Sequence, residues 1–166
     1  MPLTVHQLTV PAFVRGLTVL DTLLTKAEAH VAETGTSLQD LFDARLAPDM
    51  LTLSAQIQRA SDTSKLAVAR LTGAAAPAFE DNEATFPELH TRLAKTIAWI
   101  ESVDPAAFEG AETRTVELKG GGGRSFAGAD FLTQFALPNF YFHVATAHGI
   151  LRNAGVPIGK RDYLGG

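Results

Sequence analysis

Apolar residues recur along the first part of the chain with the spacing of a helix that buries one side. The steps alternate between four and three residues, which is the period of an amphipathic α-helix. The residues are Phe13, Leu17, Leu20, Leu24, Ala27 and Val31. Thr34-Gly35-Thr36 follows them, and glycine at such a position commonly ends a helix. We therefore predict a first long helix, with Pro11 near its beginning, that ends close to residue 34.

Two further segments show the same period. The second helix is predicted to start after Pro48, with Asp49 at its N-terminal end, and to stop at Gly73. Ser37 is expected to cap a short helix before it, extending to about Leu46. The third long helix is predicted to begin at Thr85, because Thr85 and Glu88 have the spacing of a capping box.

The last long helix is predicted from about residue 128 to Asn153. It is apolar on several sides, so we expect it to be the most buried of the four. Pro138 lies within it and should either kink the helix or divide it. Residues 74–84 are predicted to form a surface connection, and residues 158–166 a tail on the surface.

A short segment before the last helix has a different pattern. Polar and apolar residues alternate from Arg114 to Lys119, four glycines follow, and Arg124-Ser125-Phe126 comes next. This pattern predicts a β-hairpin. The glycines lack the Gly-Lys-Ser/Thr ending of a phosphate-binding loop, so we interpret them as the hairpin turn. The sequence thus predicts an all-α protein, an antiparallel four-helix bundle with a short β-hairpin inserted before the last helix, and residues 1–166 as one domain.

Composition narrows the classes of function. The chain is 46% hydrophobic and 19% charged, as in folded proteins. Its net charge of −4 argues against nucleic acid as a partner, since nucleic-acid binders need a basic surface. The absence of cysteine excludes disulfides and thiolate metal sites. We find no apolar run long enough for a membrane span and no signal peptide, so we expect a cytoplasmic protein without a membrane partner.

One polar pair stands out in the apolar last helix. Asn139 and His143 are one helical turn apart and therefore project on the same side. Buried polar side chains need hydrogen-bond partners. The pair could bond to each other, to water or to the second helix, or it could line a functional pocket as metal ligands. His148 is five residues from His143 and points to another face, so these two histidines should not share a metal.

The second helix offers partners for this pair. Gln58, Asp62 and Lys65 follow one another at steps of four and three and share one side of the helix. This stripe could be a solvated, salt-bridged surface. If it faces the last helix, Asp62 could instead orient His143 or complete a carboxylate–histidine site. A pocket between the two helices would be lined largely by apolar side chains and would suit a small, partly apolar ligand.

Four segments of the sequence resemble an uncharacterised bacterial family that is grouped with the DinB-like (DinB/YfiT) superfamily of metalloenzyme bundles. They are residues 44–50, 114–119, 137–143 and 150–165. The resemblance covers essentially the whole chain. It implies a four-helix bundle in up-down-down-up order and a homodimer formed through helices.

The resemblance also implies a divalent-metal site, which this sequence only partly retains. The superfamily uses one histidine from the second helix and a pair spaced i,i+4 on the last. His143 matches the second member of that pair, Asn139 stands at the first, and the second helix has no histidine between Met50 and Leu71. Asp62 is the type of residue that could replace it. Zinc or nickel would bind such a site more weakly than a site of three imidazoles. Zinc, nickel and manganese are the divalent metals that we consider for it.

Three functional hypotheses follow. The first is a degenerate site between the second and last helices, formed by Asn139, His143, Asp62 and Gln58, that binds a small molecule or a partner protein. The second is a metal-dependent enzyme, a small-thiol transferase or a hydrolase, in which His143, Asn139 and Asp62 hold the ion. The third is a mainly structural homodimer. We rank the first slightly above the second because two ligand positions are lost.

Overall fold

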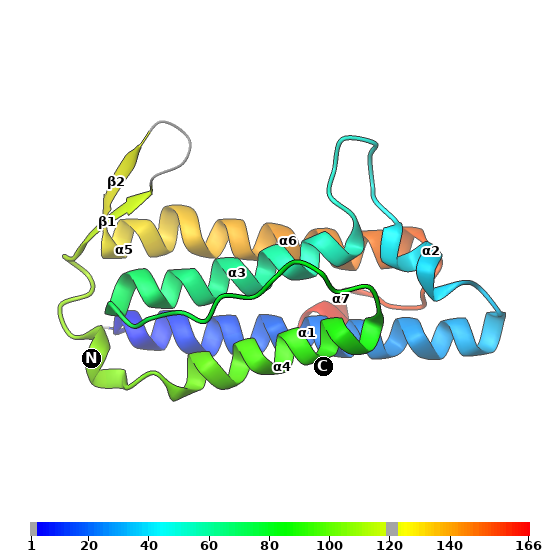
Figure 1. Ribbon diagram of the computed structural model, residues 1–166, viewed down its shortest axis with the longest axis horizontal. Helices are drawn as coiled ribbons and strands as arrows, with labels where there is room; N and C mark the ends of the chain where they lie inside the picture. Colours follow the sequence, from blue (N-terminus) through cyan, green and yellow to red (C-terminus); the bar gives the residue numbers. More distant parts are fainter. Residues whose placement is uncertain (1–2, 119–122) are drawn as a thin grey trace.

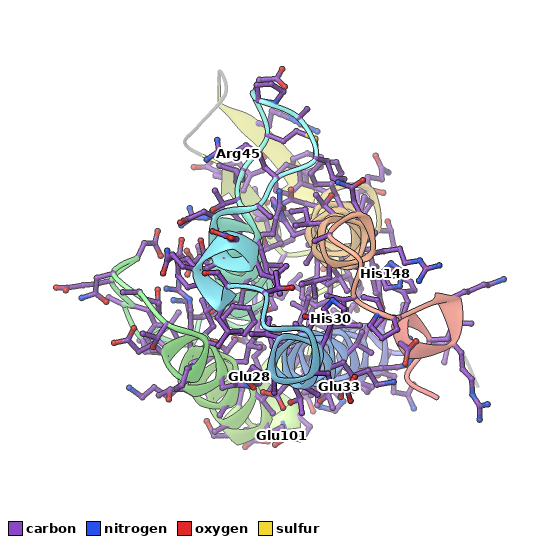
Figure 2. All side chains as sticks on the ribbon, turned by 90° about the vertical axis from the view of Figure 1, so that its right-hand side faces the viewer. Glu28, His30, Glu33, Arg45, Glu101 and His148 are labelled. Carbon is purple, nitrogen blue, oxygen red and sulfur yellow. The ribbon has the colours of Figure 1, made fainter. Side chains whose placement is uncertain are left out.

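The computed structural model describes residues 3–118 and 123–166, and its fold is mostly helical with one small antiparallel hairpin. Four long helices lie side by side along the long axis (Figure 1) and surround a common core in the end-on view (Figure 2). They are α1 (Val5–Thr34), α3 (Leu53–Thr72), α4 (Phe86–Ser102) and α6 (Leu137–Asn153). The shorter elements are α2 (Leu38–Asp43), the 3₁₀ helix η1 (Pro105–Phe108), β1 (Thr115–Leu118), β2 (Arg124–Ala127), α5 (Gly128–Phe131), the π-helix η2 (Leu132–Ala136) and α7 (Lys160–Tyr163).

The directions of the long helices match the order that the resemblance implied. Helices α1 and α6 run one way, and α3 and α4 run the other way (Figure 1). Helix α3 packs on α4 and α6, and α1 packs on the same two helices. Because α3 and α4 are parallel, the chain must cross back over the length of the bundle between them.

Residues 73–85 make this crossing, and we call them the strap. Gly73 ends α3 in the left-handed conformation, with φ of +81°. The strap then runs back along α3, so that Phe79 lies 4.1 Å below the Lys65 ammonium and Asp81 pairs with Arg59. The predicted surface connection is therefore tied to α3 by charged side chains.

Local sequence signals set most helix ends. The Thr85–Glu88 capping box is present at the start of α4, and Gly35 ends α1 in the left-handed conformation, as predicted. Two starts differ from the prediction. A capping box between Thr4 and Gln7 begins α1 at Val5, so that Pro11 lies inside the helix. Thr52, and not Asp49, caps α3.

The core lies between the four long helices and includes the predicted apolar side of α1. By length and composition alone, helix α1 is long and apolar enough to cross a membrane. The sequence analysis had found no apolar run of that length. In the structure its residues Phe13, Leu17, Leu20 and Leu24 are fully buried against the other helices.

The last helical stretch contains a register change just before Pro138. The five residues Leu132–Ala136 form a π-helix, and α6 begins at Leu137. Wider turns of this kind help a helix to accommodate proline, which lacks the amide hydrogen. Our expectation that this stretch is the most buried is wrong: Phe142 is 54% exposed, whereas α3, enclosed by α4, α6 and the strap, has 12 buried residues out of 20.

The two remaining segments also have definite places. The hairpin pairs Thr115 with Ala127 and Leu118 with Arg124, as its alternation predicted, while most of its glycine turn lies outside the described residues. The C-terminal segment is not a surface tail throughout, because Ile158 is 97% buried and α7 packs on α1. His148 Nε2 donates a hydrogen bond to the Gly159 carbonyl (3.0 Å), which fixes this segment to α6.

Candidate functional site

An open cavity of about 450 Å³ lies where α3, η2, the start of α6 and the hairpin meet, and we call it the α3–α6 pocket. Its lining residues come from these four elements. They are Arg59, Asp62, Thr63, Leu66, Arg70, Leu118, Arg124, Phe131, Phe135, Ala136 and Asn139. The pocket is therefore built from the helix pair in which the sequence predicted a site, together with the hairpin that precedes the last helix.

The inner part of the pocket is apolar. Phe131, Leu118 and Ala136 are buried, and the rings of Phe131 and Phe135 stack with centroids 5.9 Å apart. The π-helix contributes Phe135 and Ala136 to this lining. Insertions of a π turn into α-helices occur frequently at functional sites.

Three arginines give the pocket positive charge. Arg70 lies over the Phe131 ring, with 5.9 Å from its guanidinium carbon to the ring centroid, and Arg124 lies 4.8 Å from Phe126 and 5.5 Å from Phe135. Partial desolvation lowers the pKa of Arg70, whose side chain stays exposed, and arginine remains charged at neutral pH. Arg59 is engaged by Asp62 (3.3 Å) and by Asp81.

Asn139 lines the pocket, whereas His143 lies one turn beyond it. Asn139 Nδ2 donates a hydrogen bond to Thr63 Oγ1 on α3 (3.0 Å). His143 is 91% buried, and its Nδ1 lies 2.7 Å from Gln56 Oε1. Since the amide oxygen can only accept, Nδ1 is assigned as the donor. Burial, and secondarily the Arg59 charge, lower the pKa of His143 and favour its neutral form.

Asp62 and Gln58 make their hydrogen bonds on another side of α3. Asp62 Oδ1 accepts from Arg92 Nη2 on α4 (2.9 Å) and pairs with Lys65 (3.0 Å). Gln58 Nε2 donates to Glu83 Oε2 on the strap (2.9 Å). The predicted polar stripe of Gln58, Asp62 and Lys65 thus faces α4 and the strap. It does not face bulk solvent or His143. Asp62 still shares the pocket with Asn139, but Gln58 does not line it.

Arg92 is the centre of this second polar cluster. Its side chain is 99% buried, and its Nη1 donates to Glu83 Oε1 (2.9 Å) and to the Glu80 carbonyl (3.2 Å). Its Nε donates to Ser61 Oγ on α3 (3.1 Å). A single side chain of α4 therefore connects α3 and the strap.

The donor atoms at these positions do not fit the metal site that the superfamily implies. Over residues 3–118 and 123–166, no three His, Cys, Asp or Glu side chains converge on one point. His143 Nδ1 is bonded to Gln56, Asn139 to Thr63, and Asp62 to three cations. Zinc, nickel and manganese require several donors directed at one position. The metal-ligand role of His143, Asn139 and Asp62 stays a prediction that this geometry does not favour.

Comparison with known proteins identifies the family. Residues 5–164 match the family model described as a domain of unknown function, DUF1993. The chain belongs to the DUF1993 family. Its structure is similar to the crystal structure of a DinB family member protein from Shewanella denitrificans, with 40% identity, a TM-score of 0.92, and coverage of 97% of this chain and 92% of that chain. No curated protein matches the sequence. The grouping of this DUF1993 chain with the DinB-like bundles is thereby confirmed.

Sequence reasoning missed the arginines of the pocket and the partner of His143. One signal was available for the α3 residues: Arg59, Thr63, Leu66 and Arg70 recur at steps of four, three and four, and so share a side of the helix. No local pattern relates Gln56 to His143, or Arg124 to α3, because these contacts join residues far apart in the chain.

Proposed function

We propose that this DUF1993 protein binds a small molecule in the α3–α6 pocket, and that its four long helices form a DinB-like four-helix bundle that supports this site. The observation that carries the proposal is the pocket itself, a cavity of about 450 Å³ that is lined by stacked phenylalanines, other apolar side chains and several polar groups. Ligand sites in proteins combine these features.

The same geometry favours binding over metal-dependent catalysis. The transferase or hydrolase hypothesis needs His143, Asn139 and Asp62 around one ion, and their hydrogen bonds go to three different partners. His143 also does not line the pocket. A partly apolar ligand, as expected from the apolar sides of the two helices, suits the Phe131 and Phe135 rings.

Chemical-shift mapping tests the proposal. ¹⁵N-labelled protein is titrated with benzoate, phenyl phosphate, benzamide and benzylamine, and we expect at least one compound to shift the amide signals of Thr63, Leu66, Phe135 and Asn139. Leu66→Trp should weaken this binding, because Leu66 is 38% exposed at the pocket and an indole there narrows the opening. Leu51→Trp is the matched control, since Leu51 is 46% exposed but does not line the pocket. Binding by none of the four compounds, or binding unaffected by Leu66→Trp, would contradict the proposal.

A homodimer is the second candidate, and a surface feature supports it. Among the described residues, six large hydrophobic side chains are exposed, and four of them lie on residues 44–52, α3 and α6: Leu46, Leu51, Leu66 and Phe142. Residues 44–52 and the hairpin project from this side at opposite ends of the molecule (Figures 1 and 2). Sedimentation velocity at micromolar concentration should show a dimer that Phe142→Glu dissociates. A wild-type protein that is strictly monomeric would contradict this candidate.

A further inference from the structure

We propose that the ligand of the α3–α6 pocket is a small organic anion, a carboxylate or phosphate attached to an apolar body. This inference rests on the proposed function and specifies its ligand class. Its basis is the charge of the lining, which contains Arg59, Arg70 and Arg124 and a single carboxylate, Asp62.

The lone carboxylate of the pocket is already neutralised. Asp62 pairs with Lys65 (3.0 Å) and Arg92 (2.9 Å) in addition to Arg59 (3.3 Å). Arg59 in turn has a second carboxylate, Asp81, on the strap. The charges of Asp62 and Arg59 are thus balanced within the protein. The positive charge that remains for a ligand is that of Arg70 and Arg124.

Arg70 and Arg124 are the residues available for an anion. Within residues 3–118 and 123–166, neither has a carboxylate oxygen within 4 Å, and the six remaining residues of the chain include no acidic side chain. They approach the cavity from α3 and from β2, respectively. An anion placed between them would gain charge-assisted hydrogen bonds without displacing an existing ion pair.

The phenylalanines position both guanidinium groups. Arg70 lies over Phe131, and Arg124 lies over Phe126 and Phe135. Arginine stacked on an aromatic ring keeps its edge N–H groups free for a carboxylate or phosphate. The Phe131 and Phe135 rings also line the cavity and provide an apolar surface for the body of the ligand. A lysine at either position would give charge but not this planar stacking.

Matched pairs of probes test the ligand class. Benzoate and benzamide have nearly the same shape and differ in charge. In low salt we expect benzoate to bind the pocket about tenfold more tightly than benzamide, since hydrogen bonds to charged groups are stronger than neutral ones. Added salt should weaken benzoate binding and leave benzamide unchanged. Phenyl phosphate, titrated in parallel, distinguishes a phosphate ligand from a carboxylate.

Arginine variants assign the effect to residues. Arg70→Gln and Arg124→Gln should each reduce the affinity for benzoate about fivefold, with no change for benzamide, as both side chains are solvent-exposed and the loss is moderated by screening. Arg45→Gln is the control, because Arg45 is an exposed arginine outside the pocket (Figure 2). Both variants remove exposed side chains, and unchanged melting curves verify that they fold.

The outcomes separate the two proposals. If benzamide or benzylamine binds at the pocket as tightly as the anions, the ligand class is wrong and the proposed binding function stands. The ligand class is also wrong if both Gln variants bind benzoate like the wild type. If none of the four compounds binds, the proposed function and this inference both fail.

Discussion

At the scale of single residues, His143 differs from the other histidines in its surroundings. It is enclosed between α3 and α6, its Nδ1 is bonded to the Gln56 amide oxygen, and no carboxylate among the described residues pairs with it. Burial is the first cause and the Arg59 charge the second cause of its lowered pKa. Protonation of His143 would therefore place an unbalanced charge in the helix interface.

This environment predicts a specific pH dependence of stability. The unfolded chain takes up a proton at His143 near the ordinary value of 6.5, whereas the folded protein does so only at lower pH. The stabilising contribution of neutral His143 is thus present above pH 6.5 and is lost as the pH falls toward the folded pKa. Denaturant unfolding of the wild type and of His143→Gln, from about pH 7.5 to about pH 5.5, should show a shallower decline for the variant. Asn139→Ala, a non-titrating change one turn away, should retain the wild-type slope, and equal slopes for the wild type and His143→Gln would contradict the assignment.

At the scale of secondary-structure elements, two glycines inside helices have opposite surroundings. Gly16 of α1 faces α6, and a Cβ there would lie 2.4 Å from Phe140 Cε1. Phe140 is fully buried and packs edge-on against Phe13, so the ring has little room to move. A Cβ at Gly149 of α6 would meet only Leu46 Cδ1, at 3.4 Å.

Alanine substitutions should therefore change stability in opposite directions. Gly16→Ala gains helix propensity but crowds the core, and we expect a net loss of about 1–2 kcal/mol in the free energy of unfolding. Gly149→Ala gains the same helix propensity, and its only close neighbour, Leu46, is partly exposed and can move. This substitution should raise the free energy of unfolding by up to about 1 kcal/mol. Urea unfolding of the two variants measures both values. Stabilisation by Gly16→Ala would show that α1 and α6 are less closely packed than the structure indicates.

The elements themselves were largely predictable, whereas their mutual rotation was not. The Thr85–Glu88 box, the stop at Gly73 and the alternation of residues 114–119 act through neighbours in the sequence. The hydrogen bond of His143 with Gln56 and the ion pair of Asp62 with Arg92 depend on how α3 is turned relative to α6 and α4. Periodicity indicates that Asp62 and Gln58 share a side of a helix, but not which neighbour that side meets. The helical period of the last helix was enough to suggest that Asn139 could line a pocket. Arg70 and Arg124 were missed because their place at the pocket depends on how α3 and the hairpin pack together.

At the scale of the whole molecule, the Arg92 cluster determines how the strap is held. The parallel arrangement of α3 and α4 requires a connection along the bundle, and its residues Glu80 and Glu83 are bonded by Arg92. Asp62 belongs to this cluster and also lines the α3–α6 pocket. The α3–α6 pocket and the strap are therefore connected through Asp62 and Arg92, as well as through the Arg59–Asp81 pair.

Removal of Arg92 should destabilise the protein and loosen the strap. Arg92→Met leaves Glu83, whose side chain is 90% buried, without its cation and removes one of the partners of Asp62. Breaking buried ion pairs from one side costs about 3–5 kcal/mol, and we expect about 3 kcal/mol because Asp62 keeps Lys65 and is partly solvated. The ¹⁵N order parameters of the backbone amides of residues 78–83 should fall in the variant relative to the wild type.

The control and the counter-test use the same measurements. Arg152→Met removes an exposed arginine from the last turn of α6 and should change stability by less than about 0.5 kcal/mol. If Glu83→Gln is combined with Arg92→Met, part of the loss should be recovered, because position 83 then no longer carries a buried charge without a cation. Equal destabilisation by the single and double variants would mean that Arg92 stabilises the bundle by packing on Phe79, which lies 5.6 Å from its guanidinium carbon, and not through its charge.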